Sequence, residues 1–298
     1  MTHLTNLIYK TTIITILIAT NLSAHHFWVN SFESFEHKPG HTMVGLGWGH
    51  GVPVDDILNS PNGKVIVEKF SITNPKGEVT NLRIPSSKLQ DPAQKTSSYD
   101  IYNADIGLQK IALKKDTPKG TYLIEANSKA TYYTRYIDTK DRQRLKLTSK
   151  DKIKDIKKVL MSVKYQVFAK SYLTLGKWQE QKPLNNDLEI VPLNDLSNVK
   201  VGDLVEFKVL FKGKPLNITA QSPETLGAFS DSFGQKDGFF LASYLINGKG
   251  QFKIQSKGQW IVHCYHTEHV TKDGILKDLY TKVDQVIQGA TLTFNVKE

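Results

Sequence analysis

The histidines of this chain are concentrated in two short segments, and imidazole is the commonest side-chain ligand of transition metals in proteins. One group lies between residues 25 and 50 and a second between residues 263 and 269, whereas residues 51–262 contain none. Imidazole nitrogens suit nickel, copper and zinc, so the clustering predicts a transition-metal site without selecting the metal. In chain order these eight residues are His25, His26, His37, His41, His50, His263, His266 and His269, and the ninth histidine, His3, lies in the first 24 residues.

The first 24 residues have the order of a secretory signal peptide. Lys10 precedes an apolar run over residues 11–20, which ends in Leu22-Ser23-Ala24. Such a leader is cleaved after its last small residue. An uncleaved membrane anchor is the alternative, but a span needs about 20 apolar residues, well beyond this run. We therefore expect residues 1–24 to be removed and the protein to work in the periplasm.

Cleavage after Ala24 would give His25 a free α-amine beside its own imidazole. An α-amine and a first-residue imidazole can hold one metal ion together. A second-residue histidine, here His26, can instead bind with the amine and the intervening amide nitrogen. The sequence leaves open which of the two histidines is the ligand, and a frayed terminus with no ligand role is the alternative to both.

The second histidine group lies at the end of a predicted strand. Because side chains alternate along a strand, His263 and Tyr265 should face one side, and Cys264 and His266 the other. His263 and His266 should then not enter one site together while the strand stays regular. His266 would pair with Glu268 or His269 in the following loop, or His263 would act with groups from elsewhere; surface-loop histidines are the alternative. Cys264, flanked by apolar residues, is expected to be a small buried hydrophobe.

A glycine-rich segment, residues 45–51, surrounds His50. It resembles a phosphate-binding loop only superficially, because a dinucleotide fingerprint leads into a helix and here Val52-Pro53 follows. The glycines are expected to let the chain turn sharply and present His50, with Asp55 and Asp56 nearby in sequence. Motifs of serine, metallo- or cysteine hydrolases are absent from the sequence, so we predict no enzymatic activity.

The charge and cysteine content limit the class of protein. The formal net charge is +10, and removing Lys10 with the leader takes it from +10 to +9. A basic exported protein is expected to make peripheral contact with acidic envelope surfaces rather than to bind nucleic acid. The single cysteine, Cys264, forms no internal disulfide, so the fold should rest on its hydrophobic core.

Turn signals and apolar alternation predict a mainly β fold with two β-sandwich (immunoglobulin-like) domains and one connecting amphipathic helix. Apolar residues at positions 153, 156, 160, 163 and 167 have the spacing of a helix, which we place at residues 151–173. The predicted organisation is a signal peptide (1–24), an N-terminal β domain (25–138), a helical connector (139–184) and a C-terminal immunoglobulin-like domain (185–298).

The chain also resembles a family of exported bacterial proteins of unknown function that is associated with nickel and cobalt uptake and related to NikK-type periplasmic components. The resemblance implies a periplasmic component that binds nickel or cobalt and delivers it to a transporter, without catalysis. The matching segments cover nearly the whole mature chain: Ala24-His25-His26-Phe27-Trp28, Lys38-Pro39-Gly40, Gly49-His50-Gly51-Val52-Pro53, Lys119-Gly120-Thr121-Tyr122, Phe168-Ala169-Lys170-Ser171, Leu188-Glu189-Ile190-Val191-Pro192, Val209-Leu210-Phe211-Lys212-Gly213-Lys214-Pro215 and Gly258-Gln259-Trp260.

We accordingly expect His25, His26 and His50 to share one metal site, completed by His263 or His266. Ni²⁺ is the expected ion, with Co²⁺ or Cu²⁺ as alternatives. The expected partner is an inner-membrane nickel/cobalt transporter or an outer-membrane receptor. Two other functions stay open: an envelope adhesion or protein/glycan-interaction protein in which the histidines are incidental, and a copper-handling protein with an amino-terminal histidine brace.

Overall fold

The structure is a computed structural model that describes residues 25–60, 63–88, 93–217, 224–234 and 240–297. The predicted signal peptide lies outside these residues. Within them the chain is almost entirely β-sheet, and the only helical elements are two 3₁₀ turns, η1 (Lys150–Lys152) and η2 (Lys277–Leu279). No helix in this part of the chain is long and apolar enough to cross a membrane. The prediction of a mainly β protein is confirmed.

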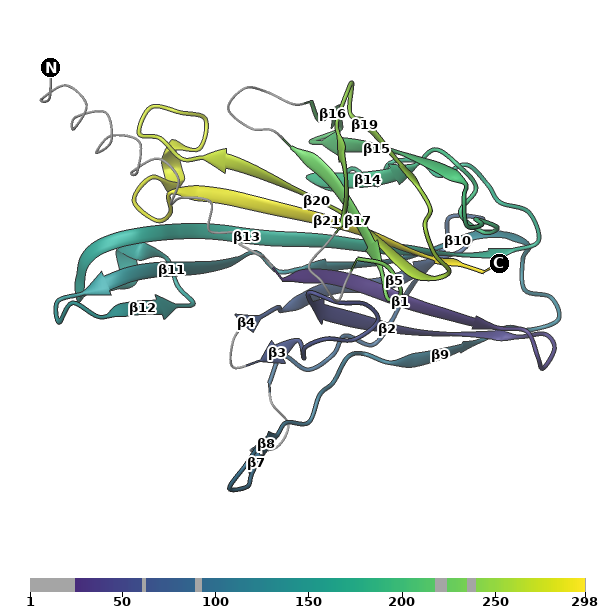
Figure 1. Cartoon of the computed structure of the whole chain (residues 1–298), viewed down its shortest axis with the longest axis horizontal. Coiled ribbons are helices and arrows are strands. Elements are labelled where there is room, and N and C mark those ends of the chain that lie inside the picture. The colour runs from purple at the N-terminus through teal and green to yellow at the C-terminus, as the bar shows by residue number, and fades with distance from the viewer. Residues whose placement is uncertain (1–24, 61–62, 89–92, 218–223, 235–239, 298) are drawn as a thin grey trace, which may run out of the picture.

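A ten-stranded sheet forms the centre of the molecule (Figure 1). Its main path runs in the order β18-β17-β20-β21-β13-β10-β5-β6, and β11 and β12 extend it beside β13. The strands, in chain order, are β5 (Val67–Thr73), β6 (Val79–Asn81), β10 (Gly120–Ser128), β11 (Thr131–Asp138), β12 (Gln143–Lys146), β13 (Ile156–Leu175), β17 (Thr225–Ser230), β18 (Leu241–Tyr244), β20 (Gly258–His269) and β21 (Gln285–Val296).

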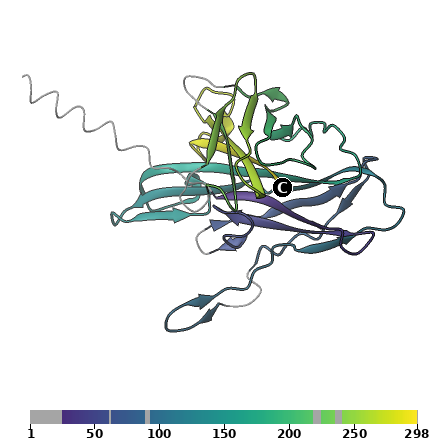
Figure 2. The same cartoon turned by 45° about the vertical axis from the view of Figure 1, so that its right-hand side comes forward.

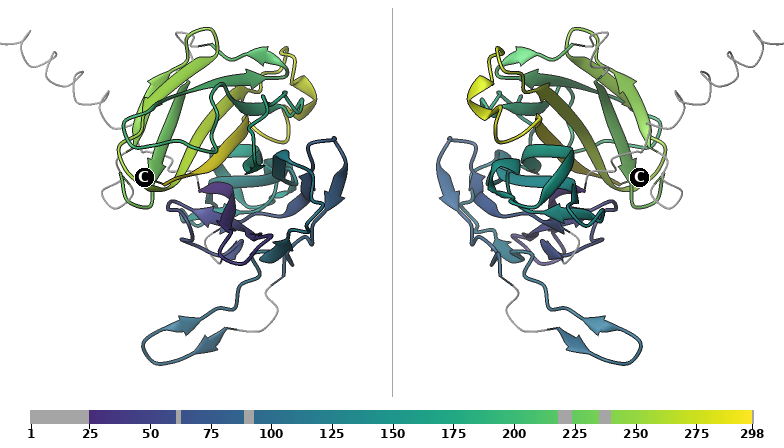
Figure 3. Two further views of the ribbon diagram at one scale, coloured as in Figure 1. Left: turned by 90° about the vertical axis from the view of Figure 1, so that its right-hand side faces the viewer. Right: turned by 90° about the vertical axis from the view of Figure 1, so that its left-hand side faces the viewer.

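Two smaller sheets pack against this central sheet, one on the N-terminal strands and one on the C-terminal strands (Figure 3). The first contains β1 (His26–Ser34), β2 (His41–Gly49) and β9 (Gln109–Ala112). The second contains β14 (Leu188–Pro192), β15 (Leu204–Phe211), β16 (Lys214–Pro215) and β19 (Lys249–Lys253). Two short hairpins complete the fold, formed by β3 (Asn59–Ser60) with β4 (Gly63–Lys64) and by β7 (Gln94–Lys95) with β8 (Asp100–Ile101). The β7–β8 hairpin projects away from the body of the molecule (Figure 2).

The predicted connecting helix is wrong, because most of that segment forms the long strand β13. Val167, Ala169 and Leu173 face the core beneath β1 and β2, while Phe168 faces the core beneath β14 and β15. A strand buried on both faces has apolar residues at odd and even positions alike. Of the residues at helical spacing, Val163 and Val167 are buried in β13 but Leu160 is exposed, so the spacing does not mark one buried helical face. Strand β13 pairs with β10, β11 and β21, so the central sheet joins strands from both predicted domains.

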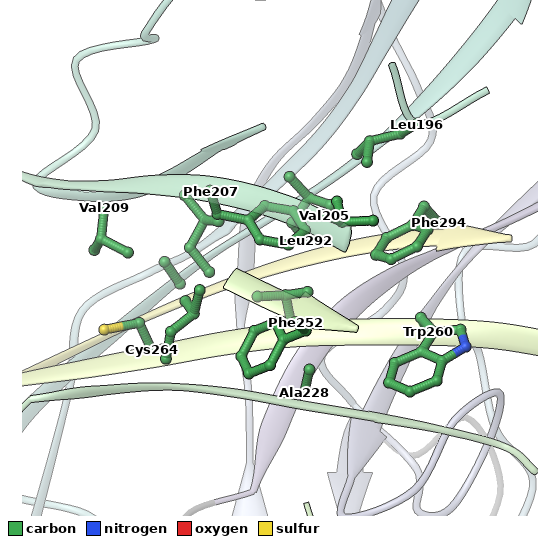
Figure 4. Close-up of a cluster of buried hydrophobic side chains, with 14 of the residues drawn as sticks. Leu196, Val205, Phe207, Val209, Ala228, Phe252, Trp260, Cys264, Leu292 and Phe294 are labelled. Carbon is green, nitrogen blue, oxygen red and sulfur yellow. The ribbon is translucent and has the colours of Figure 1, made fainter. Parts of the chain in front are cut away.

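The C-terminal core lies between the second small sheet and strands β17, β20 and β21 (Figure 4). Phe207 and Phe252 come from the small sheet, and Trp260 and Leu292 come from the central sheet. Cys264 is fully buried in the same core, and burial raises the pKa of its thiol. The expectation that Cys264 acts as a buried small hydrophobe agrees with this position.

Strand β1 is fixed against the opposite face of β21 by a row of side-chain hydrogen bonds. Thr291 donates to the carbonyl of Phe27 at 2.6 Å, Asn295 donates to the carbonyl of Ser31 at 2.8 Å, and Thr293 between them contacts the carbonyl of Val29. These donors are alternate residues of β21, so they share one face. This row fixes the start of β1 beside β20 and β21.

Candidate metal centre

The hairpin of β1 and β2 brings His25 and His50 together. His26 is paired with Gly49 in the antiparallel register, so the residues one step further out, His25 and His50, lie opposite each other. Their ring centroids are 4.4 Å apart. We call His25 and His50 the outer pair. Because the turn at Lys38-Pro39-Gly40 fixes this register, the pairing can be anticipated from the sequence once a hairpin is assumed.

Two aspartates and one tryptophan surround the outer pair. Asp55 accepts a hydrogen bond from the backbone N–H of His50 at 2.6 Å, and Asp56 Oδ2 lies 4.0 Å from His25 Nε2. Trp48 stacks on the His25 ring with centroids 5.1 Å apart, and its carbonyl accepts the N–H of Asp56 at 2.9 Å. Trp48 was not singled out from the sequence as part of this site. The outer pair is therefore bordered by negative charge and remains partly open, with 27% of the His25 side chain exposed.

Gly49 is required at the end of β2. Its φ is +126°, a region that residues with a Cβ rarely adopt, and a Cβ there would lie 2.3 Å from Asp55 Oδ2. The glycine thus lets the chain turn so that the Asp55 carboxylate reaches the backbone of His50. This agrees with the expectation that glycines present His50.

A second pair forms between β1 and β20, where the ring centroids of His26 and His263 lie 4.3 Å apart. We call His26 and His263 the inner pair. His263 is directly opposite Gly227 in the β17–β20 register, and its ring covers that glycine, because a Cβ on Gly227 would lie 2.3 Å from His263 Nε2. That nitrogen is buried and has no hydrogen-bond partner among the described residues. Phe229 closes the space beside both rings, at 5.7 and 5.9 Å.

Two tyrosines hold the start of β1. Tyr265 Oη lies 2.8 Å from His26 Nδ1 and 3.3 Å from the carbonyl oxygen of His25. Tyr165, from β13, donates to the same carbonyl at 3.1 Å. Burial raises the pKa of both phenols, so both are protonated at neutral pH. Strand alternation had placed Tyr265 on the face of His263, but nothing in the sequence indicated Tyr165.

His266 is not part of this group. It lies on the other face of β20, where Nδ1 is 2.6 Å from the Glu224 carboxylate and the ring packs against Phe211 at 4.1 Å. The predicted alternation of His263 and His266 is therefore observed. Of the five predicted ligands, the structure gathers His25, His26, His50 and His263 and leaves His266 apart.

Three of the gathered histidines, His25, His26 and His263, favour their neutral form. Burial, followed by the neighbouring His50, lowers the pKa of His25, while Asp56 and Asp55 act in the opposite direction. The pKa of His26 is lowered well below its usual value by burial and then by His263. Burial lowers the pKa of His263 to about 4. Neutral imidazole carries the lone pair that binds a metal, so the donor chemistry fits a transition-metal ion.

The side chains form two pairs rather than one closed cluster. Within the described part of the chain, no group of three or more His, Cys, Asp or Glu side chains is arranged to hold a metal ion together. The α-amine that cleavage after Ala24 would create is a further nitrogen donor beside the outer pair. An open set of few donors is typical of sites that keep a coordination position free.

Comparison with known proteins adds a family and no function. No curated protein matches the chain. A family model described as "Domain of unknown function (DUF4198)" matches residues 22–268, a segment that includes all four gathered histidines and begins just before the predicted cleavage point. Because this match covers most of the chain, the protein belongs to the DUF4198 family.

Proposed function

We propose that the mature protein binds one transition-metal ion, Ni²⁺ or Co²⁺, through His25, His26, His50 and His263, and delivers it for uptake. One observation carries the proposal: His50 and His263, from two separate segments, lie against His25 and His26, the first two residues that the mature chain would have. Beside the carboxylates of Asp55 and Asp56, the donors of the site are imidazole and amine nitrogens, which nickel and cobalt accept.

Each pair has a distinct part in the proposal. The outer pair, with the α-amine of His25, captures the ion at the surface, and Asp55 and Asp56 raise the local concentration of cations. The inner pair supplies two further imidazoles from a less accessible position. His266 has no part, because it lies on the opposite face of β20 from His263 and packs against Phe211 and Glu224.

The proposed setting is the periplasm, after cleavage of residues 1–24. The partner would be an inner-membrane nickel/cobalt transporter or an outer-membrane receptor. Loss of Lys10 with the leader would lower the net charge from +10 to +9, and this positive charge would favour contact with acidic envelope surfaces. We further infer that each small sheet with its half of the central sheet is an immunoglobulin-like sandwich. We propose no catalytic turnover.

The test is calorimetric titration of the protein that begins at His25 with NiCl₂, alongside His25→Ala, His50→Ala and a form with one extra amino-terminal residue. We expect tight one-to-one binding for the authentic form and weaker binding for the other three. Titration with Co²⁺ and Cu²⁺ then ranks the metals. Equal nickel binding by all four forms, or none by the authentic form, would overturn the proposal.

A further inference from the structure

Tyr265 is placed to decide which nitrogen of His26 is available to a metal. Its hydroxyl oxygen lies 3.3 Å from the carbonyl oxygen of His25 and 2.8 Å from Nδ1 of His26, and it also contacts the hydroxyl of Tyr165. The ring reaches them by lying across β21 at Gly289, where a Cβ would come within 2.7 Å of Tyr265 Cε1. Gly289 of β21, the strand between β20 and β13, therefore leaves the space in which the phenol ring lies.

The proton count assigns the direction of both hydrogen bonds. A phenol has one proton, and a carbonyl oxygen can only accept. When Tyr265 donates its proton to the His25 carbonyl, its oxygen accepts a hydrogen bond from Nδ1–H of His26. With Tyr165 also in contact with Tyr265, this is the arrangement in which the three protons of Tyr265, Tyr165 and His26 make hydrogen bonds of all three contacts, the two of Tyr265 and that of Tyr165 with the His25 carbonyl. His26 then carries its proton on Nδ1 and its lone pair on Nε2.

We propose, on the basis of the metal site above, that Tyr265 is a positioning residue that occupies Nδ1 of His26. His26 then binds the metal through Nε2, and His25 forms the chelate with the α-amine. A second-residue histidine forms a chelate with the amine and the intervening amide only through Nδ1, because the ring through Nε2 is too large to close. With Nδ1 held by Tyr265, that chelate is blocked.

The surroundings of His25 complete the assignment. Its Nε2 faces Asp56 at 4.0 Å, which leaves Nδ1 to close a six-membered ring with its own α-amine. A carboxylate facing the non-ligating nitrogen is the usual support of a metal-bound histidine. The two adjacent histidines are thus assigned different ligand atoms, Nδ1 for His25 and Nε2 for His26.

The first experiment needs no metal. Nitrogen-15 NMR of the histidine rings in the metal-free protein reports which nitrogen carries the proton, and the His26 signal is identified by its loss in His26→Gln. We expect the Nδ1–H form of His26 in the wild type and in Tyr165→Phe, which removes the bond to the His25 carbonyl and the contact with the Tyr265 hydroxyl but leaves the Tyr265–His26 bond in place. We expect Tyr265→Phe to lose this preference. An Nε2–H form in the wild type would overturn the proposal.

The second experiment counts protons released per nickel ion, by calorimetry in buffers of different ionisation enthalpy. Binding through the amide nitrogen releases its proton, so Tyr265→Phe should release about one proton more than the wild type, and Tyr165→Phe should match the wild type. Affinity in Tyr265→Phe should change by about 10-fold or more, because loss of a group that hydrogen-bonds the other nitrogen of a metal-binding histidine typically has an effect of that size. Equal proton release in all three proteins would refute the role of Tyr265, whereas absence of nickel binding in the wild type would instead refute the proposed function.

Discussion

The two faces of strand β20 place the same side chain in opposite situations. His263 faces β1, where its neighbours are rings, a glycine and His26. His266, three residues later, faces the C-terminal core, where Nδ1 lies 2.6 Å from a buried glutamate. Both histidines belong to the group that the sequence singled out, and their spacing alone puts them on different faces.

The difference shows what makes a buried histidine available to a metal. In His266 a carboxylate at hydrogen-bond distance holds one imidazole nitrogen. His263 has no such partner among the described residues, and burial without a partner favours the neutral ring. The surroundings of His263 thus preserve a lone pair, whereas those of His266 engage its ring within the protein.

The largest effect should come from removing each histidine in turn. His263→Ala should weaken nickel binding by roughly 100-fold or more, because loss of a direct ligand should cost at least as much as loss of an outer-shell partner. His266→Ala should change it by less than about twofold. Calorimetric titration of both variants makes the comparison. If His266→Ala weakens binding as much as His263→Ala does, the two faces are not functionally distinct.

The second effect is on stability as a function of pH in the metal-free protein. The pKa of His263 is about 4 when folded and 6.5 in the reference state, so the unfolded chain binds the proton more readily. The contribution of neutral His263 is complete above pH 6.5 and is lost as pH falls towards 4, amounting to about 2 kcal/mol between pH 8 and pH 5. His26 acts in the same direction.

Urea unfolding of the wild type and His263→Gln at pH 8 and pH 5, with a chelator present, measures this contribution. The free energy of unfolding should fall less with acid in His263→Gln than in the wild type. His266→Gln provides the matched comparison on the other face. Identical acid sensitivity of the wild type and His263→Gln would show that His263 is not held in its neutral form.

Strand alternation was sufficient to separate His263 from His266, because it depends only on local backbone geometry. The same local reasoning failed for β13, because the residues at helical spacing do not share one buried face: Val163 and Val167 are buried, whereas Leu160 is exposed. The approach of His26 to His263 depends on the row of bonds from β21 to β1, which no pattern in either segment indicates. Tyr165 was missed for the same reason, since it reaches His25 from the far side of that junction.

A smaller change tests the space that His263 occupies. Gly227→Ala would place a Cβ 2.3 Å from His263 Nε2, so the imidazole must move away from β17. We expect nickel affinity to fall about 10-fold, equivalent to about 1.4 kcal/mol, with the fold retained by circular dichroism. Gly250→Ala is a suitable control. A Cβ on Gly250 would have Leu226 as its nearest neighbour, at 3.1 Å, in the C-terminal core and on the opposite face of the sheet from His263. Unchanged affinity in Gly227→Ala would place the ligand nitrogen elsewhere.

The smallest effect should come from the partner of His266. Glu224→Gln keeps the size of the side chain but removes its charge, so the hydrogen bond to His266 Nδ1 becomes weaker. The free energy of unfolding should fall by about 1 kcal/mol, while nickel affinity stays within about twofold of the wild type. Glu268→Gln, which breaks the more exposed contact with Lys212 at 3.1 Å, should cost less than about 0.5 kcal/mol, because exposed ion pairs contribute little. A loss of nickel affinity in Glu224→Gln without a loss of stability would mean that the carboxylate serves the metal site, and would remove the distinction between the two faces of β20.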